Sequence, residues 1–313
     1  MNKGVYIQME NKNVVVLGSL NYDLILTQER LPHKGETFYA DSLLQGPGGK
    51  GANQAVQCAK LGLNTTLIGK VGEDRFGEAL IGSMRSAGIH TEKIKQKGQS
   101  GLGLVNVLYD GDYHSTILKG ANYLLDIEDV EREDALFKSA DYIILQQEIP
   151  AHVNDYVIKK YNDNTTIILN NAPARNIEKN ILKKLDYLVV NETEAEFMVG
   201  KVVSNVKQAF EAAQELYSKI ETTIVLTLGK SGVVLNDGKQ IFHVPAEEVK
   251  AIDTTGAGDS FIGAFVYSLT QGYHLKEAVQ FANHVSALTV KNNGGSESFP
   301  VLKDCIAADS NKI

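Results

Sequence analysis

The 313-residue sequence has only two cysteines, Cys58 and Cys305, and neither lies in a cluster of the metal-binding type. A disulfide framework is therefore excluded, and a reducing compartment is the simplest interpretation. Long hydrophobic runs are also absent, because stretches such as 261–269 fall far short of a membrane span. Residues 1–10 lack the apolar core of a secretory signal peptide. We therefore expect a cytoplasmic protein that has no membrane partner.

Positive charge is scarce too. The chain has 31 Lys and Arg against 38 Asp and Glu, which gives a formal net charge of -7. Such a chain lacks the electrostatic footprint of a protein that binds nucleic acid. Hydrophobic residues make up 43% of the sequence and charged residues 22%, which excludes a disordered or collagen-like chain and provides apolar mass for a full core. Any bound anion must therefore be held by local geometry.

Short apolar runs alternate with segments of helical period along most of the chain. This alternation is typical of βαβ units and predicts an α/β fold with a mostly parallel sheet. The strands are apolar throughout, which indicates that helices cover both faces of the sheet. The predicted strands are 14–17, 66–68, 142–145, 166–169, 187–190, 223–227, 232–235 and 240–244. The predicted helices are 51–61, 75–87, 128–139, 151–161, 192–199, 205–219, 258–270 and 275–291.

Two stretches interrupt this alternation. Residues 23–44 and 101–119 contain short β-like segments, with turn signals at 32–35 and 109–112, and little helical pattern. They are either two ordinary surface hairpins or a small separate sheet that covers a cleft as a lid. The sequence alone does not favour one over the other.

The sharpest motif is Asp-Thr-Thr-Gly-Ala-Gly-Asp at 253–259, which leads into an apolar helix. A glycine-rich loop at the start of a helix leaves backbone N–H groups unpaired, and these groups favour a bound anion. A carboxylate beside an anion site repels phosphate, so Asp259 is better suited to act on the other reactant. It could accept a proton from an attacking hydroxyl as a general base. The structural alternative is that Asp259 only caps the helix.

A second glycine-rich run, Gly-Pro-Gly-Gly-Lys-Gly-Ala-Asn-Gln-Ala at 46–55, also leads into a helix. Its spacing fits neither a Walker A loop nor a dinucleotide fingerprint. Close backbone approach to a small polar ligand fits better, with Lys50 and Asn53 as hydrogen-bonding groups. A tight strand-to-helix turn would explain the glycines but not these two side chains together.

Three weaker motifs follow predicted strands, where α/β sheets bind ligands. Asn21 and Asp23 could hold sugar hydroxyls, although both are common turn residues. The run 191–194 could orient water around Mg²⁺, or it could be an acidic first turn of a helix. The glycine-rich turn 227–232 could contact phosphate or ribose, or it could be an ordinary turn.

Taken together and in this order, the motifs resemble the ribokinase branch of the PfkB carbohydrate-kinase family. The resemblance spans nearly the whole chain, from Gly18 to about Pro300. Its most specific stretches are 48–55, 191–196 and 253–259, with support from 120–122 and 172–175.

The resemblance implies one kinase domain over residues 1–313, built as a three-layer αβα sandwich with a mostly parallel central sheet. A small β-sheet lid, from roughly 23–45 and 101–120, would cover the site and form a homodimer interface. The implied reaction transfers the γ-phosphoryl group of ATP to a sugar hydroxyl, which is C5-OH in the case of ribose. The implied cofactors are Mg²⁺ with ATP and K⁺ or another monovalent cation.

The resemblance also implies roles for individual residues. Asp259 would be the catalytic base, and Gly256, Ala257 and Gly258 would form the anion hole. The implied sugar-binding residues are Asn21, Asp23, Gly49, Lys50, Gly51, Asn53, Glu148 and Asp259. The implied nucleotide-binding residues are Asn191, Thr227, Gly229, Lys230, Gly232, Gly258 and Asn283. The implied ligands of the monovalent cation are Asp253, Thr255, Thr289, Asn292, Gly294 and Ser298, while Glu194 would reach Mg²⁺ through water.

Two alternatives stay open at this stage. Tyr22 stands between two sugar-binding candidates, and its ring could stack on a nucleobase. The substrate could therefore be another pentose, deoxyribose or a nucleoside instead of ribose. The second alternative is a catalytically silent sugar-binding or regulatory protein, which the intact Asp259 and its Gly-Ala-Gly loop argue against.

Overall fold

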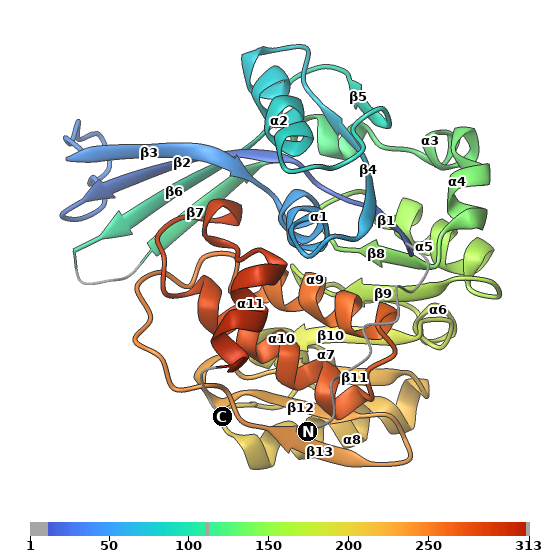
Figure 1. Cartoon of the computed structure of the whole chain (residues 1–313). Coiled ribbons are helices and arrows are strands. Elements are labelled where there is room, and N and C mark those ends of the chain that lie inside the picture. Colours follow the sequence, from blue (N-terminus) through green and yellow to red (C-terminus); the bar gives the residue numbers. More distant parts are fainter. Residues whose placement is uncertain (1–11, 110–112, 311–313) are drawn as a thin grey trace.

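The computed structural model describes residues 12–109 and 113–310 of the chain. The N-terminal residues 1–10 and the predicted turn at 110–112 lie outside this described part. Within it, a nine-stranded sheet forms the centre of the molecule (Figure 1). Its strands are β1 (Asn13–Leu17), β4 (Asn64–Val71), β5 (Ile94–Gln96), β8 (Tyr142–Leu145), β9 (Thr166–Asn170), β10 (Tyr187–Asn191), β11 (Thr223–Thr227), β12 (Val233–Asn236) and β13 (Ile241–Val244).

The order of the strands in this sheet is β13-β12-β11-β10-β9-β8-β1-β4-β5. The strands from β11 to β5 pair in parallel, and β12 and β13 add an antiparallel edge. Parallel neighbours end at the same edge of the sheet, so the polar residues that follow β1, β8, β9 and β10 are brought together there.

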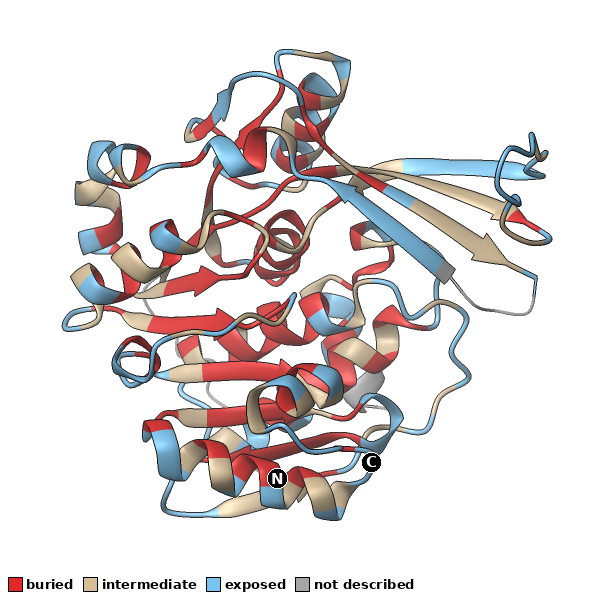
Figure 2. Cartoon of the chain, turned by 180° about the vertical axis from the view of Figure 1, so that it is seen from behind, coloured by how far each residue is buried: buried red, intermediate tan, exposed pale blue. Residues whose placement is uncertain are grey.

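Two layers of helices cover the sheet. Along β1, Val14 and Val16 pack into one apolar cluster and Val15 and Leu17 into the other, because successive side chains of a strand point to opposite faces. Figure 2 shows the resulting buried strands between the helical layers. This arrangement confirms the predicted three-layer α/β fold with a mostly parallel sheet.

The first apolar cluster packs under helices α1 (Lys50–Lys60), α2 (Arg75–Ser86), α9 (Ala257–Thr270), α10 (Leu275–Thr289) and α11 (Leu302–Ser310). The second packs under α3 (Ile127–Arg132), α4 (Asp134–Ser139), α5 (Ala151–Tyr161), α6 (Lys179–Leu182), α7 (Glu192–Val199) and α8 (Val206–Ile220). None of the helices in the described part of the chain has the length and apolar character that a membrane span requires.

The prediction of one helix over 128–139 is wrong. The structure has α3 and α4 there, divided at Glu133, whose φ of -109° and ψ of 20° depart from helical geometry. A reciprocal pair of hydrogen bonds between Asp126 and Asp129 starts the first helix. The sequence analysis also did not predict β5, α6, α11 or the short 3₁₀ segments η1 (Gly120–Leu124), η2 (Gly229–Ser231) and η3 (Ser296–Ser298).

A second sheet, called the small sheet below, extends away from the main body (Figure 1). It consists of β2 (Asn21–Gln28), β3 (Ser42–Gly48), β6 (Gly101–Leu108) and β7 (Tyr113–Leu118), in the order β3-β2-β6-β7. Because β2 pairs with both β3 and β6, the two predicted β-like stretches form one sheet and not two separate hairpins. The sheet begins at Asn21 and β3 reaches Gly48, so it extends a few residues beyond the predicted stretch 23–44.

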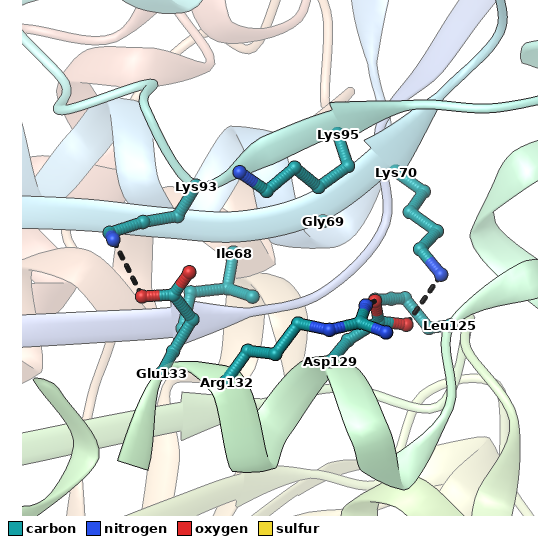
Figure 3. Close-up of a pocket in the computed structure, with 9 residues that line it drawn as sticks. All are labelled: Ile68, Gly69, Lys70, Lys93, Lys95, Leu125, Asp129, Arg132 and Glu133. Atoms are coloured by element: carbon teal, nitrogen blue, oxygen red, sulfur yellow. Dashed lines mark hydrogen bonds and ion pairs between the residues drawn. The ribbon is translucent and has the colours of Figure 1, made fainter. Parts of the chain in front are cut away.

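One surface pocket lies between β4, β5 and α3 (Figure 3). Several of its charged side chains pair with one another: Lys70 and Arg132 with Asp129, and Lys93 with Glu133 at 2.6 Å. The Lys70 ammonium is nearly buried and also donates to the carbonyl of Leu124, at 2.7 Å. None of the predicted site residues lines this pocket, so the candidate site lies elsewhere.

Candidate active site

Asp259 lies in the first turn of α9 and does not cap the helix. Gly256 occupies the capping position with φ 76° and ψ -1°, and no side chain caps this end. A Cβ at Gly256 would lie 2.7 Å from the ring of Phe299, so both the backbone conformation and the available space favour glycine. The first amides of a helix have no acceptor within it, so those of Gly258 and Asp259 are available at this end.

The carboxylate of Asp259 is held by two amide side chains of α1. Asn53 Nδ2 donates to Asp259 Oδ2 at 3.0 Å, and Gln54 Nε2 donates to Asp259 Oδ1 at 2.9 Å. Only 7% of Asp259 is exposed. Burial raises the pKa of Asp259; Lys50 and the two amides oppose this rise, and Glu148 adds to it. The carboxylate is thus a fixed and desolvated proton acceptor.

The glycine-rich run 48–51 brings the start of α1 onto the turn that follows β1. Ser19 Oγ and the amide of Lys50 both donate to Glu148 Oε2, the latter at 3.0 Å. Gly49 has a φ of 90°, and a Cβ there would lie 2.8 Å from the backbone nitrogen of Asn21. The run therefore forms a tight strand-to-helix turn, which was the alternative interpretation of this motif. It also gathers polar groups around Glu148.

Asp23 enters the same site from the small sheet. A Cβ at Gly48 or at Gly103 would lie 2.0 or 2.2 Å from its carboxylate oxygens, so two glycines of neighbouring strands make room for this side chain. The pKa of Asp23 is raised to about 6, because burial disfavours the charged form and Glu148 and Asp259 add repulsion. Asp23, Glu148 and Asp259 therefore share one site.

Asn21 is held in place by a residue that follows the small sheet. Asn122 Nδ2 donates to Asn21 Oδ1 at 2.8 Å and to the carbonyl of Leu20 at 3.1 Å, while Asn122 Oδ1 accepts from the amide of Leu20 at 2.9 Å. These three contacts fix the turn between β1 and β2, and with it the orientation of the Asn21 amide.

The ring of Tyr22 does not lie beside Asp23. Neighbouring residues of a strand point to opposite faces, and Tyr22 packs against Phe76 of α2 with ring centroids 4.9 Å apart. The expectation that this ring could stack on a nucleobase beside the sugar site is therefore wrong.

The predicted nucleotide-binding residues begin at the ends of β10 and β11. Asn191 and Thr227 are directly paired across these two strands. Asn191 Oδ1 accepts from the amide of Glu194, and Glu194 Oε2 accepts from the amide of Asn191, both at 2.8 Å. This capping box uses one carboxylate oxygen of Glu194 and makes the acidic first turn of α7 a structural feature. Burial raises the pKa of Glu194.

The other nucleotide candidates flank the segment that follows β13. Asn283 Nδ2 donates to the carbonyls of Val244 and Pro245, at 3.4 and 3.2 Å. Gly232 has a φ of 92°, and a Cβ there would lie 2.1 Å from the Val244 carbonyl oxygen. Gly229 and Lys230 belong to η2, directly before Gly232.

Asp253 joins the loop before α9 to the loop after α10. It accepts hydrogen bonds from the amides of Thr255 at 2.9 Å and Gly294 at 3.0 Å. Burial acts to raise the pKa of Asp253, but the hydrogen bonds outweigh it and the pKa is lowered. The side chains of three other candidate cation ligands donate to protein acceptors. Thr289 donates to the Ser260 hydroxyl and the Val285 carbonyl. Asn292 donates to the Leu288 carbonyl, and Ser298 donates to the Gly295 carbonyl.

Some residues of the site were not among the sequence predictions. Gln54 contacts Asp259 directly, and Gln146 and Asn170 contact Gln54. Ser19 contacts Glu148. Gln54 follows Asn53 inside a singled-out motif, and the other three lie at strand ends, so their positions were a usable signal.

We expect Asp23→Asn to stabilise the ligand-free protein. The pKa of Asp23 is about 6 in the folded protein and 3.8 for the unconstrained group, so ionisation of this carboxyl group destabilises the folded state. The destabilisation is complete above pH 6 and is absent at pH values well below 4. Two pKa units set an upper limit of about 3 kcal/mol on the gain. Urea unfolding at pH 7.5 should show it, and the gain should shrink toward pH 4. The exposed Asp163→Asn is the control, and an equal change in both variants would contradict the expectation.

Comparisons with known proteins identify the family of the chain. The family model described as pfkB family carbohydrate kinase matches residues 11–302. A ribokinase of Staphylococcus aureus (strain COL) is 37% identical over 95% of this chain and 99% of its own length. A deoxyribokinase of Salmonella typhi is 34% identical over 93% and 96%. The structure of Arabidopsis thaliana ribokinase complexed with ribose and ATP superposes with a TM-score of 0.86 at 29% identity, covering 95% of this chain and 98% of that one. The chain therefore belongs to the pfkB family of carbohydrate kinases.

Proposed function

We propose that this ATP-dependent sugar kinase phosphorylates D-ribose at its C5 hydroxyl. The observation that carries the proposal is the buried carboxylate of Asp259, which lies in the first turn of α9 and shares one site with Asp23 and Glu148. The ribokinases similar to this chain, one of them complexed with ribose and ATP, support ribose as the sugar.

In the proposed step, the sugar hydroxyl oxygen attacks the γ-phosphorus of ATP and its proton passes to a carboxylate oxygen of Asp259. A bond forms between that oxygen and phosphorus, and the bond from phosphorus to the bridging oxygen of ADP breaks. The proposed anion hole consists of the amides of Gly256, Ala257 and Gly258 at the positive end of α9, where they would favour the charge that develops on the phosphoryl group. The Ala257 amide also donates to the carbonyl of Thr254, at 3.2 Å.

The sugar hydroxyls would be held by groups from both sheets. Asn53 Oδ1 is buried and has no hydrogen-bond partner within the described residues, so it fits an acceptor for a bound hydroxyl. Asp23 supplies further acceptor oxygens from the small sheet. The remaining proposed sugar contacts are Asn21, Gly49, Lys50, Gly51 and Glu148.

Another sugar is the second candidate. The deoxyribokinase relative has nearly the same identity to this chain as the ribokinases, so deoxyribose stays the strongest alternative. The packing of Tyr22 against Phe76 removes the feature that favoured a nucleoside.

ATP would bind along the ends of β10 and β11. The proposed contacts are Asn191, Thr227, Gly229, Lys230, Gly232, Gly258 and Asn283. Mg²⁺ would neutralise phosphate charge there. Its fit to the chain rests on Glu194, whose second carboxylate oxygen lies outside the capping box and could hold a water of the hydrated ion. Within the described residues no three His, Cys, Asp or Glu side chains are grouped to hold a metal, so phosphates and water would supply most ligands.

A monovalent cation such as K⁺ would bind near Asp253. The nearby donor set fits, because a carboxylate and backbone carbonyls are hard oxygen ligands. Asp253 already joins residues 253–255 to Gly294. The proposed ligands are Asp253, Thr255, Thr289, Asn292, Gly294 and Ser298. The ion would supply fixed positive charge beside the loop that precedes α9.

We further propose that the small sheet acts as a lid and as a homodimer interface, in one kinase domain that works in the cytoplasm. Asp23, one of the proposed sugar contacts, lies on this sheet. Its outer part exposes Leu43, Leu44 and Ile117, at 52%, 64% and 48%, which is costly unless another surface covers them. Sedimentation velocity would measure the oligomeric state.

The substrate assignment predicts a strong preference for ribose over 2-deoxyribose. A buried site that binds a hydroxyl rejects analogues lacking it, by up to about 10⁴-fold, because its polar groups are left unpaired. ADP formation with a panel of pentoses and nucleosides measures kcat/KM for each. Higher kcat/KM for deoxyribose or a nucleoside would overturn ribose while leaving the kinase activity in place.

We expect Asp259→Asn to fold and bind ATP but to lose most of its turnover. The amide keeps the size of the side chain but cannot take the hydroxyl proton, and a positioned base contributes about 10²- to 10⁴-fold in rate. Single-turnover rates and ATP titration separate chemistry from binding. If the variant keeps more than about a tenth of wild-type activity, Asp259 is not the base.

K⁺ should activate the enzyme more than Na⁺ does. An ion beside Asp253 would hold the loop before α9, so that its amides face the developing charge. Initial rates in K⁺, Na⁺ and tetramethylammonium buffers of equal ionic strength test this. Equal rates in K⁺ and tetramethylammonium would exclude a role for the ion.

A further inference from the structure

We propose that Gln54 is the positioning residue of the reaction: its amide orients the Asp259 carboxylate toward the sugar hydroxyl. The inference rests on the proposed role of Asp259 as base. It concerns a residue that has no assigned role above and whose side chain is fully buried.

The amide of Gln54 is at the centre of a buried hydrogen-bond network. Its nitrogen donates to Asp259 Oδ1 at 2.9 Å and to Asn170 Oδ1 at 3.3 Å, and its oxygen accepts from Gln146 Nε2 at 2.7 Å. Gln54 is 0% exposed. The network ties the first turn of α9 to the ends of β8 and β9, which are rigid parts of the central sheet.

The orientation of this amide follows from its partners. If it were turned by 180°, the Gln54 oxygen would face two acceptor oxygens, those of Asp259 and Asn170, and its nitrogen would face the nitrogen of Gln146. Every contact would then be repulsive, so only the donor-to-carboxylate arrangement is stable. Gly18 contributes as well, because a Cβ there would lie 2.0 Å from Gln146 Oε1.

The contact has two consequences for a base. Asn53 and Gln54 take one lone pair of each Asp259 oxygen, which fixes the plane of the carboxylate and leaves the remaining lone pairs in defined directions. Donation to the charged form also favours ionisation, so it offsets part of the burial effect on Asp259. The charged groups that face this carboxylate are Lys50 on α1, Glu148 after β8, Asp23 on β2 and Glu194 on α7.

Helix α1 offers a matched control. Gln57 lies on the same helix, is also 0% exposed, and donates to the carbonyl of Pro300 at 3.2 Å instead of to Asp259. Gln54→Met and Gln57→Met remove the same amide from equally buried positions of one helix. A general loss of packing would affect both, whereas loss of carboxylate orientation would affect only the first.

The experiment measures the pH profile of kcat, the KM for ribose and for ATP, and the thermal midpoint of each variant. We expect Gln54→Met to lower kcat by about tenfold to a hundredfold, with both KM values within about twofold. The acid limb of its profile should move to higher pH, since the carboxylate loses a donor. Gln54→Glu should move it further, because a second carboxylate would face Asp259. Gln57→Met should leave kcat and the acid limb unchanged.

Gln146→Met is the substitute test if the Gln54 variants do not fold. It removes only the group that holds the Gln54 oxygen, and it should give a smaller shift of the acid limb in the same direction. Equal kcat and equal acid limbs in Gln54→Met and Gln57→Met would overturn the inference. If Asp259→Asn loses activity in the same assay, only the role of Gln54 has failed; if Asp259→Asn stays active, the base itself is wrong.

Discussion

The site depends on the close packing of α1 against α9. A carboxylate as buried as that of Asp259 is tolerable only if neighbouring groups donate hydrogen bonds to it. Those donors come from α1, so the two helices must approach closely. Gly263 permits the approach, because a Cβ there would lie 2.6 Å from the Cβ of Gln57. The same contact that buries the apolar faces of these helices also places Asn53 and Gln54 against the Asp259 carboxylate.

The electrostatics of the site separate its two substrates. Asp23, Glu148 and Asp259 repel one another, which is part of the reason that the pKa of Asp23 is raised to about 6. This negative region suits hydroxyl groups, which donate to carboxylates, and it disfavours phosphate. The phosphates instead suit the positive end of α9. Although the protein has a net charge of -7, it can therefore bind an anionic nucleotide, because the attraction is local.

The sequence predicted the central sheet and the glycine-rich helix starts well, since both depend on local patterns. Apolar runs marked β1, β8, β9 and β10, and α9 begins directly after Gly256, within the glycine-rich motif. The division of 128–139 into α3 and α4 was missed, because a change of direction at Glu133 leaves the helical period almost intact. The contacts of Gln54 could not be predicted, because its partners are 92 to 205 residues away in the sequence. Tyr22 was misplaced because the sequence analysis began the β-like stretch at residue 23, whereas β2 begins at Asn21 and so turns Tyr22 to the face opposite Asp23.

The position of Asp23 links the proposed sugar binding to the small sheet. Asn53, Glu148 and Asp259 belong to the main body, whereas Asp23 is fixed by its strand neighbours Gly48 and Gly103. The two parts join at the turn between β1 and β2, which Asn122 holds through Leu20 and Asn21. The proposed set of sugar contacts therefore requires both sheets in one relative position. A hydroxyl ligand that bonds to both Asp23 and Asn53 would favour that position, so the proposed sugar binding and the proposed closure of the small sheet would be two aspects of the same equilibrium.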